Sequence, residues 1–360
     1  MDVSSQADQP AVAARPKRPR RADWFTFAIL AVAIIGSLLP AQGVAIQVLD
    51  VGSKIAIALL FYLYGVRLEP KQTIAGLKHW RLHGTILGCT YVIFPIIGVA
   101  LGLLVPWFIS PEIYRGVLFL SLLPSTVQSS INFTSIARGN IAGAIVSASM
   151  SNLLGVIITP LLAIWLMSTT GLHLQASSIL DIGGQILLPF VLGQLTRRWT
   201  AEWVLAHPKL KYFDQASVLL VVYKAFSQGV RDGIWQRTGI VEILQILLLS
   251  AVVLTVMLGL TWWLAKALGF NRADQIAIQF CGTKKSLVTG VPMAGVMFAG
   301  ADIGLMVLPL MIFHQLQLMV CGSLAGHYAQ KDDAWHQIGD AQPASSSSSD
   351  SESAEVQDDA

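Results

Sequence analysis

Leu123-Pro-Ser-Thr-Val-Gln-Ser-Ser-Ile-Asn-Phe-Thr-Ser135 and Cys281-Gly-Thr-Lys-Lys-Ser-Leu-Val-Thr-Gly-Val-Pro292 interrupt two otherwise apolar segments with polar and helix-breaking residues. A continuous helix satisfies its own backbone, whereas proline and glycine loosen the hydrogen-bond ladder. Each stretch therefore predicts a broken helix whose freed backbone groups must face protein, an ion or water. Broken segments at matching positions of two halves are typical of a transporter's central site, and simple packing kinks are the alternative.

The composition predicts an all-α polytopic membrane protein. Of the 360 residues, 54% are hydrophobic and 12% are charged, and the mean hydropathy is +0.62, which exceeds the needs of a soluble domain. Apolar runs separated by polar segments predict ten transmembrane helices. Their ranges are 24–39, 45–65, 84–105, 113–136, 141–167, 179–197, 213–230, 240–268, 274–297 and 301–325.

Basic residues set the orientation of these spans. If the N-terminus is cytoplasmic, most of the 24 lysines and arginines fall on the cytoplasmic side, including the run Arg15-Pro-Lys-Arg-Pro-Arg-Arg21. The positive-inside rule therefore predicts a multi-pass protein of the cell (inner) membrane with both termini in the cytoplasm. Because this rule already explains the basic run, we expect the lipid bilayer as its neighbour and no nucleic-acid partner.

The chain divides into a basic cytoplasmic tail at 1–23, a transmembrane domain at 24–325 and a polar tail at 326–360 that we expect to be cytoplasmic and disordered. Five spans in each half, at 24–170 and 178–325, have opposite orientations because an odd number of spans inverts the second copy. Two inverted five-helix repeats, with broken fourth and ninth helices, predict alternating access.

Lys284 and Lys285 are the most unusual residues of the predicted spans. A charge at bilayer depth costs at least about 2.5–3.5 kcal/mol, so its presence indicates a compensating role. The two ammonium groups could receive an anionic substrate, could act as a permanent cation in the place of a sodium ion, or could lose a proton during transport. Snorkelling to the membrane surface is the fourth interpretation.

Other polar residues near the lysines are candidates for the same site. Ser147 and Ser151 share one helical face, although such residues also serve as packing contacts between membrane helices. His314 could carry a proton or could be a hydrogen-bonded structural residue. The complete predicted binding set is Gln128, Ser129, Ser130, Asn132, Ser147, Ser151, Thr283, Lys284, Lys285, Ser286 and His314, with no metal site and no catalytic residue.

Three motifs make the sequence similar to the bile acid:sodium symporter family. They are Ser125-Thr-Val-Gln-Ser-Ser-Ile-Asn-Phe-Thr-Ser-Ile-Ala-Arg-Gly-Asn140, Leu153-Leu-Gly-Val-Ile-Ile-Thr-Pro-Leu-Leu162 and Phe280-Cys-Gly-Thr-Lys-Lys-Ser-Leu-Val-Thr-Gly-Val-Pro-Met293. The last resembles the branch related to sodium/bile acid cotransporter 7. The resemblance covers nearly all of 24–325. It implies ten helices, a core domain that moves against a panel domain, crossing broken helices, and sodium-coupled uptake of organic anions.

The sequence departs from this family where its sodium ligands are expected. Aligned on Gly282, Phe280 takes the place of the family's carboxylate, and Lys284 and Lys285 take the places of a Gln-Asn pair. Aligned on 137–140, Ala144 and Ala148 stand where hydroxyl ligands occur, Ser130 matches and Asn132 is one position away. Two ammonium groups repel a sodium ion, so the sequence argues against sodium coupling, and we expect no cofactor.

These observations predict a secondary transporter of a small organic anion, such as a bile-acid-like carboxylate or sulfate. The alternative is a non-transporting membrane regulator of ion homeostasis, calcium in particular, which the resemblance to the cotransporter 7 branch suggests. An enzyme is not expected, because the predicted spans contain no central carboxylate, no nucleophile with a base partner and no phosphate-binding glycine loop.

Overall fold

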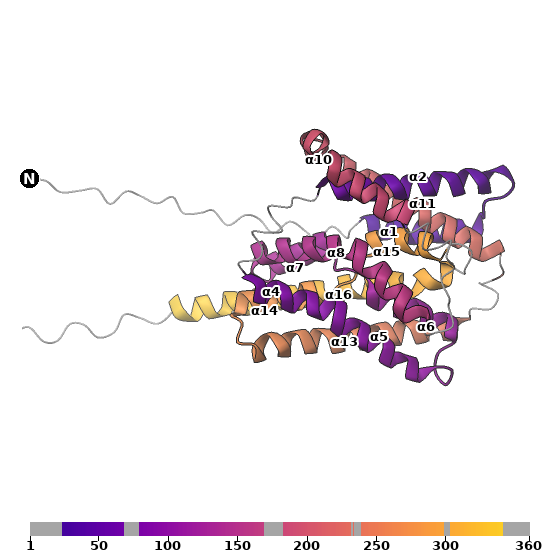
Figure 1. Ribbon diagram of the computed structural model, residues 1–360. Helices are drawn as coiled ribbons and strands as arrows, with labels where there is room; N and C mark the ends of the chain where they lie inside the picture. The colour runs from indigo at the N-terminus through magenta and orange to yellow at the C-terminus, as the bar shows by residue number, and fades with distance from the viewer. Residues whose placement is uncertain are drawn as a thin grey trace, which may run out of the picture.

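The computed structural model describes residues 24–67, 79–168, 183–231, 233, 239–298 and 303–340, and within these ranges the ordered elements are all helices (Figure 1). Each predicted span overlaps one described helix or several consecutive described helices. The basic tail, the junction near 172–181 and residues 341–360 lie outside the described residues. The α-helices are α1 (Trp24–Leu38), α2 (Val44–Arg67), α4 (Trp80–Gly88), α5 (Phe94–Ala100), α6 (Pro111–Leu122), α7 (Val127–Ile136), α8 (Ile141–Ser168), α10 (Leu188–Ala206), α11 (Leu210–Arg231), α13 (Ile240–Ala267), α14 (Arg272–Thr283), α15 (Leu287–Met297) and α16 (Ile303–Asp340). Shorter elements are the π-helices η2 (Cys89–Ile93) and η4 (Gly183–Leu187) and the 3-10 helix η3 (Leu101–Leu104).

Apolar length indicates how many of these helices can cross a bilayer. Five are long and apolar enough, namely Val44–Arg67, Trp80–Leu104, Ile141–Ser168, Ile240–Ala267 and Ile303–Gln330. The broken helices fall short individually, with 12 and 10 residues in α6 and α7 and 12 and 11 residues in α14 and α15. The chain is therefore a multi-pass membrane protein, whereas the count of ten spans stays a prediction.

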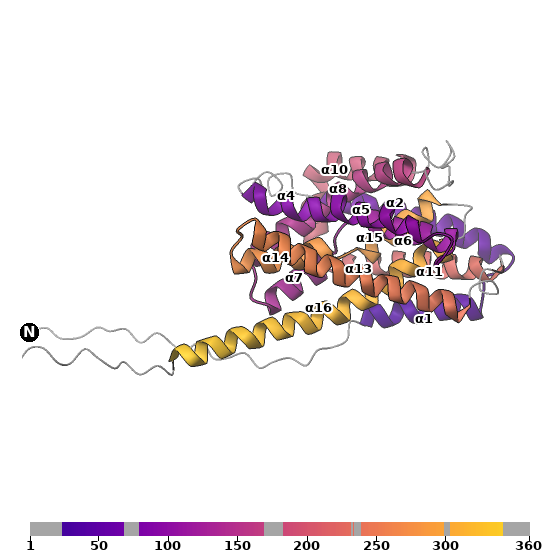
Figure 2. The same ribbon diagram turned by 90° about the horizontal axis from the view of Figure 1, so that it is seen from below.

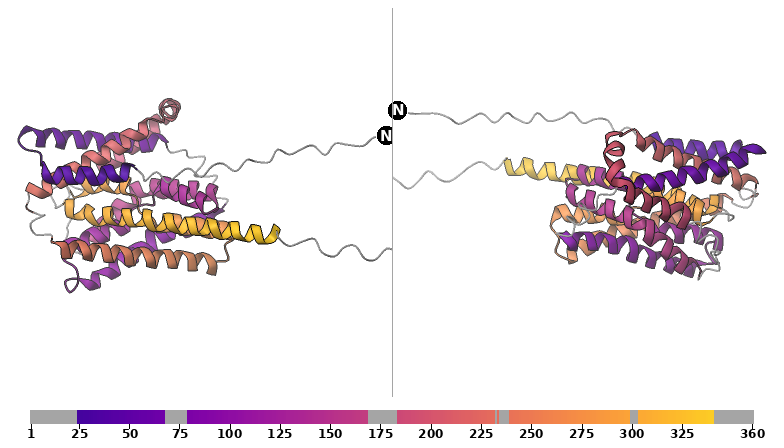
Figure 3. Two further views of the ribbon diagram at one scale, coloured as in Figure 1. Left: turned by 180° about the vertical axis from the view of Figure 1, so that it is seen from behind. Right: turned by 45° about the horizontal axis from the view of Figure 1, so that its top comes forward.

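The helices pack as two groups. The four-helix group consists of α1, α2, α10 and α11, in which α2 contacts α10, α1 contacts α11 and α11 contacts α2. It occupies the upper part of the view in Figure 1, and Figure 3 shows it from two other sides. The remaining group contains the segments from α4 to α8 and from α13 to α16. The two groups meet where α11 contacts α15 and α16.

Two glycines allow α2 and α10 to cross in backbone contact. A Cβ atom at Gly65 would lie 2.1 Å from the Phe190 carbonyl oxygen, and one at Gly193 would lie 2.2 Å from the Tyr62 carbonyl oxygen. Any other residue at these positions would push the helices apart. Without a hydrophobic driving force between helices in lipid, such close approach supplies the packing contacts that hold them together.

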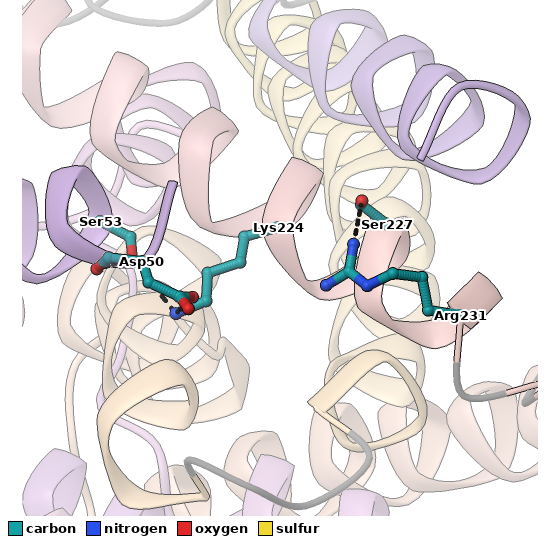
Figure 4. A network of polar contacts seen from close by, with 5 residues as sticks. All are labelled: Asp50, Ser53, Lys224, Ser227 and Arg231. Atoms are coloured by element: carbon teal, nitrogen blue, oxygen red, sulfur yellow. Dashed lines mark hydrogen bonds and ion pairs between the residues drawn. The ribbon is translucent and has the colours of Figure 1, made fainter. Parts of the chain in front are cut away.

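Ion pairs join α2 to α11 at both ends. Lys224 of α11 contacts the Asp50 carboxylate at 2.8 Å and donates to Ser53 Oγ at 3.3 Å, as Figure 4 shows. About two turns further along α11, Arg231 donates to Ser227 Oγ at 2.9 Å. At the opposite end, Arg67 of α2 contacts Asp214 of α11 at 2.5 Å. The antiparallel pair is therefore fixed in register by charges from both helices.

The last helix is longer than the sequence predicted. We expected order to end at residue 325, but α16 continues to Asp340 and projects beyond the other helices (Figure 2). A polar composition excludes burial in the bilayer, but it does not exclude a helix. The Tyr328 hydroxyl donates to Gln279 Oε1 at 2.9 Å and so ties the extension to α14. The expectation of disorder from residue 326 is therefore wrong as far as Asp340, whereas the end of the transmembrane domain at 325 stays a prediction.

Candidate functional site at two broken helices

The two helix breaks predicted from the sequence are present and touch each other. α6 ends at Leu122 and α14 ends at Thr283, and the next residues, Leu123 and Lys284, have extended backbone. The chain re-enters a helix after Thr126 and Ser286 respectively. The Ser286 N–H donates to the Pro124 carbonyl at 2.8 Å. This hydrogen bond brings the breaks of α6/α7 and α14/α15 into direct backbone contact in the interior.

Hydroxyl side chains at and just after the first break donate hydrogen bonds to backbone carbonyls just before the second break. Ser125 Oγ donates to the Cys281 carbonyl at 2.6 Å, and Ser130 Oγ donates to the Phe280 carbonyl at 3.5 Å. These carbonyls lie in the last turn of α14, where no intrahelical donor is available. The predicted residue Ser130 is fully buried in this position.

The backbone groups at the end of α6 also form hydrogen bonds with side chains of residues that are distant in the sequence. The Ser125 N–H, which would continue the helix, donates instead to Ser151 Oγ at 3.0 Å. Thr159 Oγ1 donates to the Leu122 carbonyl at 2.8 Å. The remaining carbonyls, those of Ser121 and Leu123, are left for a side chain from the other break. Buried carbonyls need such partners because an unpaired one costs free energy.

Lys285 supplies that partner. Its Nζ donates to the carbonyl oxygens of Leu123 at 2.7 Å, Ser121 at 2.8 Å and Thr90 at 3.0 Å. The ring centroid of Phe94 lies 4.1 Å from the same nitrogen. The side chain is fully buried, and no carboxylate of the described ranges is paired with it. Snorkelling is therefore wrong for Lys285.

A proline explains why the Thr90 carbonyl is free. In the π-helix η2 the Phe94 N–H donates to the Cys89 carbonyl, five residues back. The next donor in this register would be residue 95, which is proline and has no N–H. Because of this local sequence, the Thr90 carbonyl has no helical donor and is free to accept a hydrogen bond from a side chain of the site.

Lys284 is buried but differs from its neighbour. It is 0% exposed, and among the described residues its Nζ has no hydrogen-bond partner. The nitrogen lies 3.6 Å from the ring centroid of Phe133 and 5.7 Å from that of Phe280. Aromatic faces attract a cation but do not replace its hydrogen bonds. The ammonium can therefore still bind an acceptor, and snorkelling is wrong here as well.

Gln317 connects the second break to α16. Its side chain is hydrogen-bonded to the backbone of Lys285, and its Nε2 also lies 2.8 Å from His314 Nδ1. This contact favours the structural role of His314 over a proton carrier, because one ring nitrogen is used by a buried amide. Both residues are buried close to the two lysines.

The other predicted residues lie in three places. Gln128 and Asn132 lie on the exposed face of α7, where they contact each other at 3.3 Å. Ser147 is buried on α8 and contacts His83 Nδ1 of α4 at 2.6 Å. The rest form short contacts around the breaks: Ser129 with Thr126 at 2.6 Å, Thr283 with Thr261 at 3.2 Å, Ser151 with Ser125 and Ser286 with Thr289 at 3.1 Å.

Several residues of the site were not predicted. Ser125 lies in the first polar stretch, Leu123 to Ser135, and Gln317 follows His314 at helical spacing, so both could have been predicted. Thr159 and Thr90 could not, because their partners come from distant segments. Asn152 accepts a hydrogen bond from Thr289 at 2.6 Å and extends the polar contacts along α8. In the described part of the chain, no cluster of three His, Cys, Asp or Glu residues could hold a metal ion.

Comparisons with known proteins agree with this architecture. The model of the SBF-like CPA transporter family matches residues 23–330. PA2026 of Pseudomonas aeruginosa is 48% identical over 322 residues, which are 88% of this chain and 96% of that protein. YfeH of Escherichia coli is 45% identical over 312 residues, 86% of this chain and 94% of that protein. Sodium/bile acid cotransporter 7 of Mus musculus is 29% identical over 308 residues, 83% of this chain and 90% of that protein.

The extent of the family match and the broken helices lead to the same conclusion. The chain belongs to the SBF-like CPA transporter family, in the bile acid:sodium symporter group that its motifs resembled, and is a membrane transporter and not an enzyme.

Proposed function

We propose that the chain is a secondary transporter that moves a small organic anion by alternating access, with the four-helix group and the remaining helices moving relative to each other. Ten spans in two inverted repeats underlie this motion. The packing supports the repeats, because contacts recur when the halves are exchanged: α2 with α10 and α11 with α1, α5 with α6 and α13 with α14, α7 with α8 and α15 with α16.

The construction of the broken helices is a further support for the repeats. α6 and α14 are each 12 residues long, and each starts at a cap residue, Ser110 or Asn271, whose side chain accepts from the N–H three residues later. Each ends in an extended break followed by a second short helix. Equal lengths and equal caps at matching positions are expected of two copies of one structural unit.

The buried ammonium of Lys284 is the observation that supports an anionic substrate. A buried cation without an acceptor is costly, and an anion that enters the site would remove that cost. Charge-assisted hydrogen bonds to a carboxylate or sulfate are about twice as strong as neutral ones. The name of the mouse relative, sodium/bile acid cotransporter 7, refers to sodium and a bile acid. For this chain we propose a bile-acid-like or smaller carboxylate or sulfate.

Counterflow in proteoliposomes tests this proposal. Uptake of a labelled bile acid and of small labelled carboxylates is measured with a sodium gradient, with a proton gradient and with neither. We expect saturable exchange that does not require sodium. Lys284→Gln should lower the rate at least about tenfold, because it removes a charge-assisted hydrogen bond worth about 1.5–3 kcal/mol.

Lys266→Gln is the matched control, because Lys266 is exposed at the end of α13 and stacks on Trp262 at 4.4 Å. It should retain wild-type exchange. Wild-type rates in the Lys284→Gln variant would refute the anion site. Absence of flux for every anion under every gradient would favour the non-transporting regulator, whose effect would then be sought in calcium handling.

A further inference from the structure

We infer that the ammonium of Lys285 is a built-in monovalent cation: it fills a cage of three backbone carbonyls that would otherwise bind a free cation such as sodium. The built-in cation belongs to the structure of the protein without substrate and does not depend on which anion is transported. It is tested on purified protein without substrate, so its failure and a failure of the proposed transport are separate results.

The number of contacts indicates a cation and not a neutral amine. A protonated lysine has three N–H donors and no acceptor, and Lys285 Nζ lies 2.7, 2.8 and 3.0 Å from three carbonyl oxygens. A neutral amine has only two N–H groups, so its lone pair would face the third oxygen. The Phe94 ring lies on a further side of the nitrogen, where its negative face also favours a cation.

The electrostatic surroundings also suit a positive charge. Ser121 and Leu123 supply carbonyls from the end of α6, which is the negative end of a helix dipole. The Thr90 carbonyl comes from a register in which Pro95 provides no donor. Carbonyl oxygens are also the ligands that hard cations prefer, so this cage is chemically a cation site. The Thr90 carbonyl and the end of α6 come from different segments of the chain, which also pack against each other through contacts of η2 and α5 with α6, so the cage should persist without the lysine.

The two lysines therefore have different roles. The donors of Lys285 are used up by protein carbonyls, which leaves it with no hydrogen bond for a substrate. Lys284 has no acceptor and is available to a ligand. Removing Lys285 should create a vacancy for a cation, whereas removing Lys284 should not. This difference makes Lys284→Ala the matched control for Lys285→Ala.

Thermal unfolding in detergent, followed by fluorescence, tests the inference. Wild type, Lys285→Ala and Lys284→Ala are compared in choline chloride, sodium chloride and ethylammonium chloride at equal ionic strength. In choline, Lys285→Ala should unfold about 5–10 °C below wild type, because three buried carbonyls lose their donor. Sodium or ethylammonium should restore its midpoint saturably, and the two arms distinguish an alkali cation from an ammonium group. Lys284→Ala should show no such restoration.

Two results would overturn the inference. One is a folded Lys285→Ala protein with the wild-type midpoint in choline. The other is a destabilised but folded variant that neither cation restores, which would indicate loss of packing alone. If Lys285→Ala does not fold, the wild type decides: an equal midpoint in sodium and choline supports the built-in cation, and a saturable rise specific to sodium contradicts it.

Discussion

The side-chain amide of Gln317 is hydrogen-bonded twice to the backbone of Lys285: its Oε1 accepts from the N–H and its Nε2 donates to the carbonyl, each at 2.9 Å. Gln317 lies on α16, 32 residues further along the chain. A backbone that has left the α-helix needs such external partners in a region without water. The position of the Lys285 side chain therefore depends on α16 as well as on its own segment.

Gln317→Leu should destabilise the protein by about 2 kcal/mol or more, because it leaves the N–H and the carbonyl of Lys285 unpaired in the interior. The measurement is the free energy of unfolding in detergent, together with anion counterflow. Gln315→Leu is the control, since Gln315 is on the same helix and its Nε2 has no partner among the described residues. Equal losses in both variants would contradict the role of Gln317.

Thr159→Val should cost about 1–3 kcal/mol, because the fully buried hydroxyl donates to the Leu122 carbonyl at 2.8 Å and valine cannot replace it. The comparison is Thr255→Val on α13, where the exposed hydroxyl bonds only to the Ala251 carbonyl of its own helix. That change should lie within about 0.5 kcal/mol of wild type. A neutral Thr159→Val would show that the end of α6 does not need this donor.

Gly193→Ala should separate α2 from α10, since the new Cβ would lie 2.2 Å from the Tyr62 carbonyl oxygen. We expect a loss of about 1–3 kcal/mol, the usual cost of overpacking. Gly259→Ala on α13 meets no atom within 4 Å and should be neutral or slightly stabilising, because alanine is the better helix former. Thermal midpoints of the two variants check the difference.

A double-mutant cycle on Arg67 and Asp214 should give a coupling energy larger than that of an exposed pair. Their side chains are 27% and 14% exposed, so removing either partner leaves a poorly hydrated charge. Arg67→Gln and Asp214→Asn should each destabilise the protein, and the double variant should lose less than their sum. The Asp50–Lys224 pair serves for comparison, because Asp50 is 48% exposed and its coupling should be about 0–1 kcal/mol. Equal coupling in both pairs would be evidence against this ranking.

The sequence by itself determined the helical segments and the two breaks. Apolar runs of bilayer length, Pro124 and the glycines of the second stretch carry this information locally, because helix formation depends on nearby residues. The sequence also singled out Lys284 and Lys285, since two ammonium groups in an apolar run are costly wherever they end up. It placed the end of the last helix too early, because polarity indicates solvent exposure and not loss of helix.

Only the tertiary structure decided what the two lysines do. They are adjacent in the sequence and chemically identical, yet Lys285 meets three carbonyls from α6 and η2, and Lys284 meets two aromatic rings and no acceptor. At an extended break successive side chains point in different directions, so the surroundings of each are set by segments that the fold brings in from elsewhere. Local sequence specifies where the chain leaves the helix, and long-range packing specifies which carbonyls each lysine side chain meets at that break.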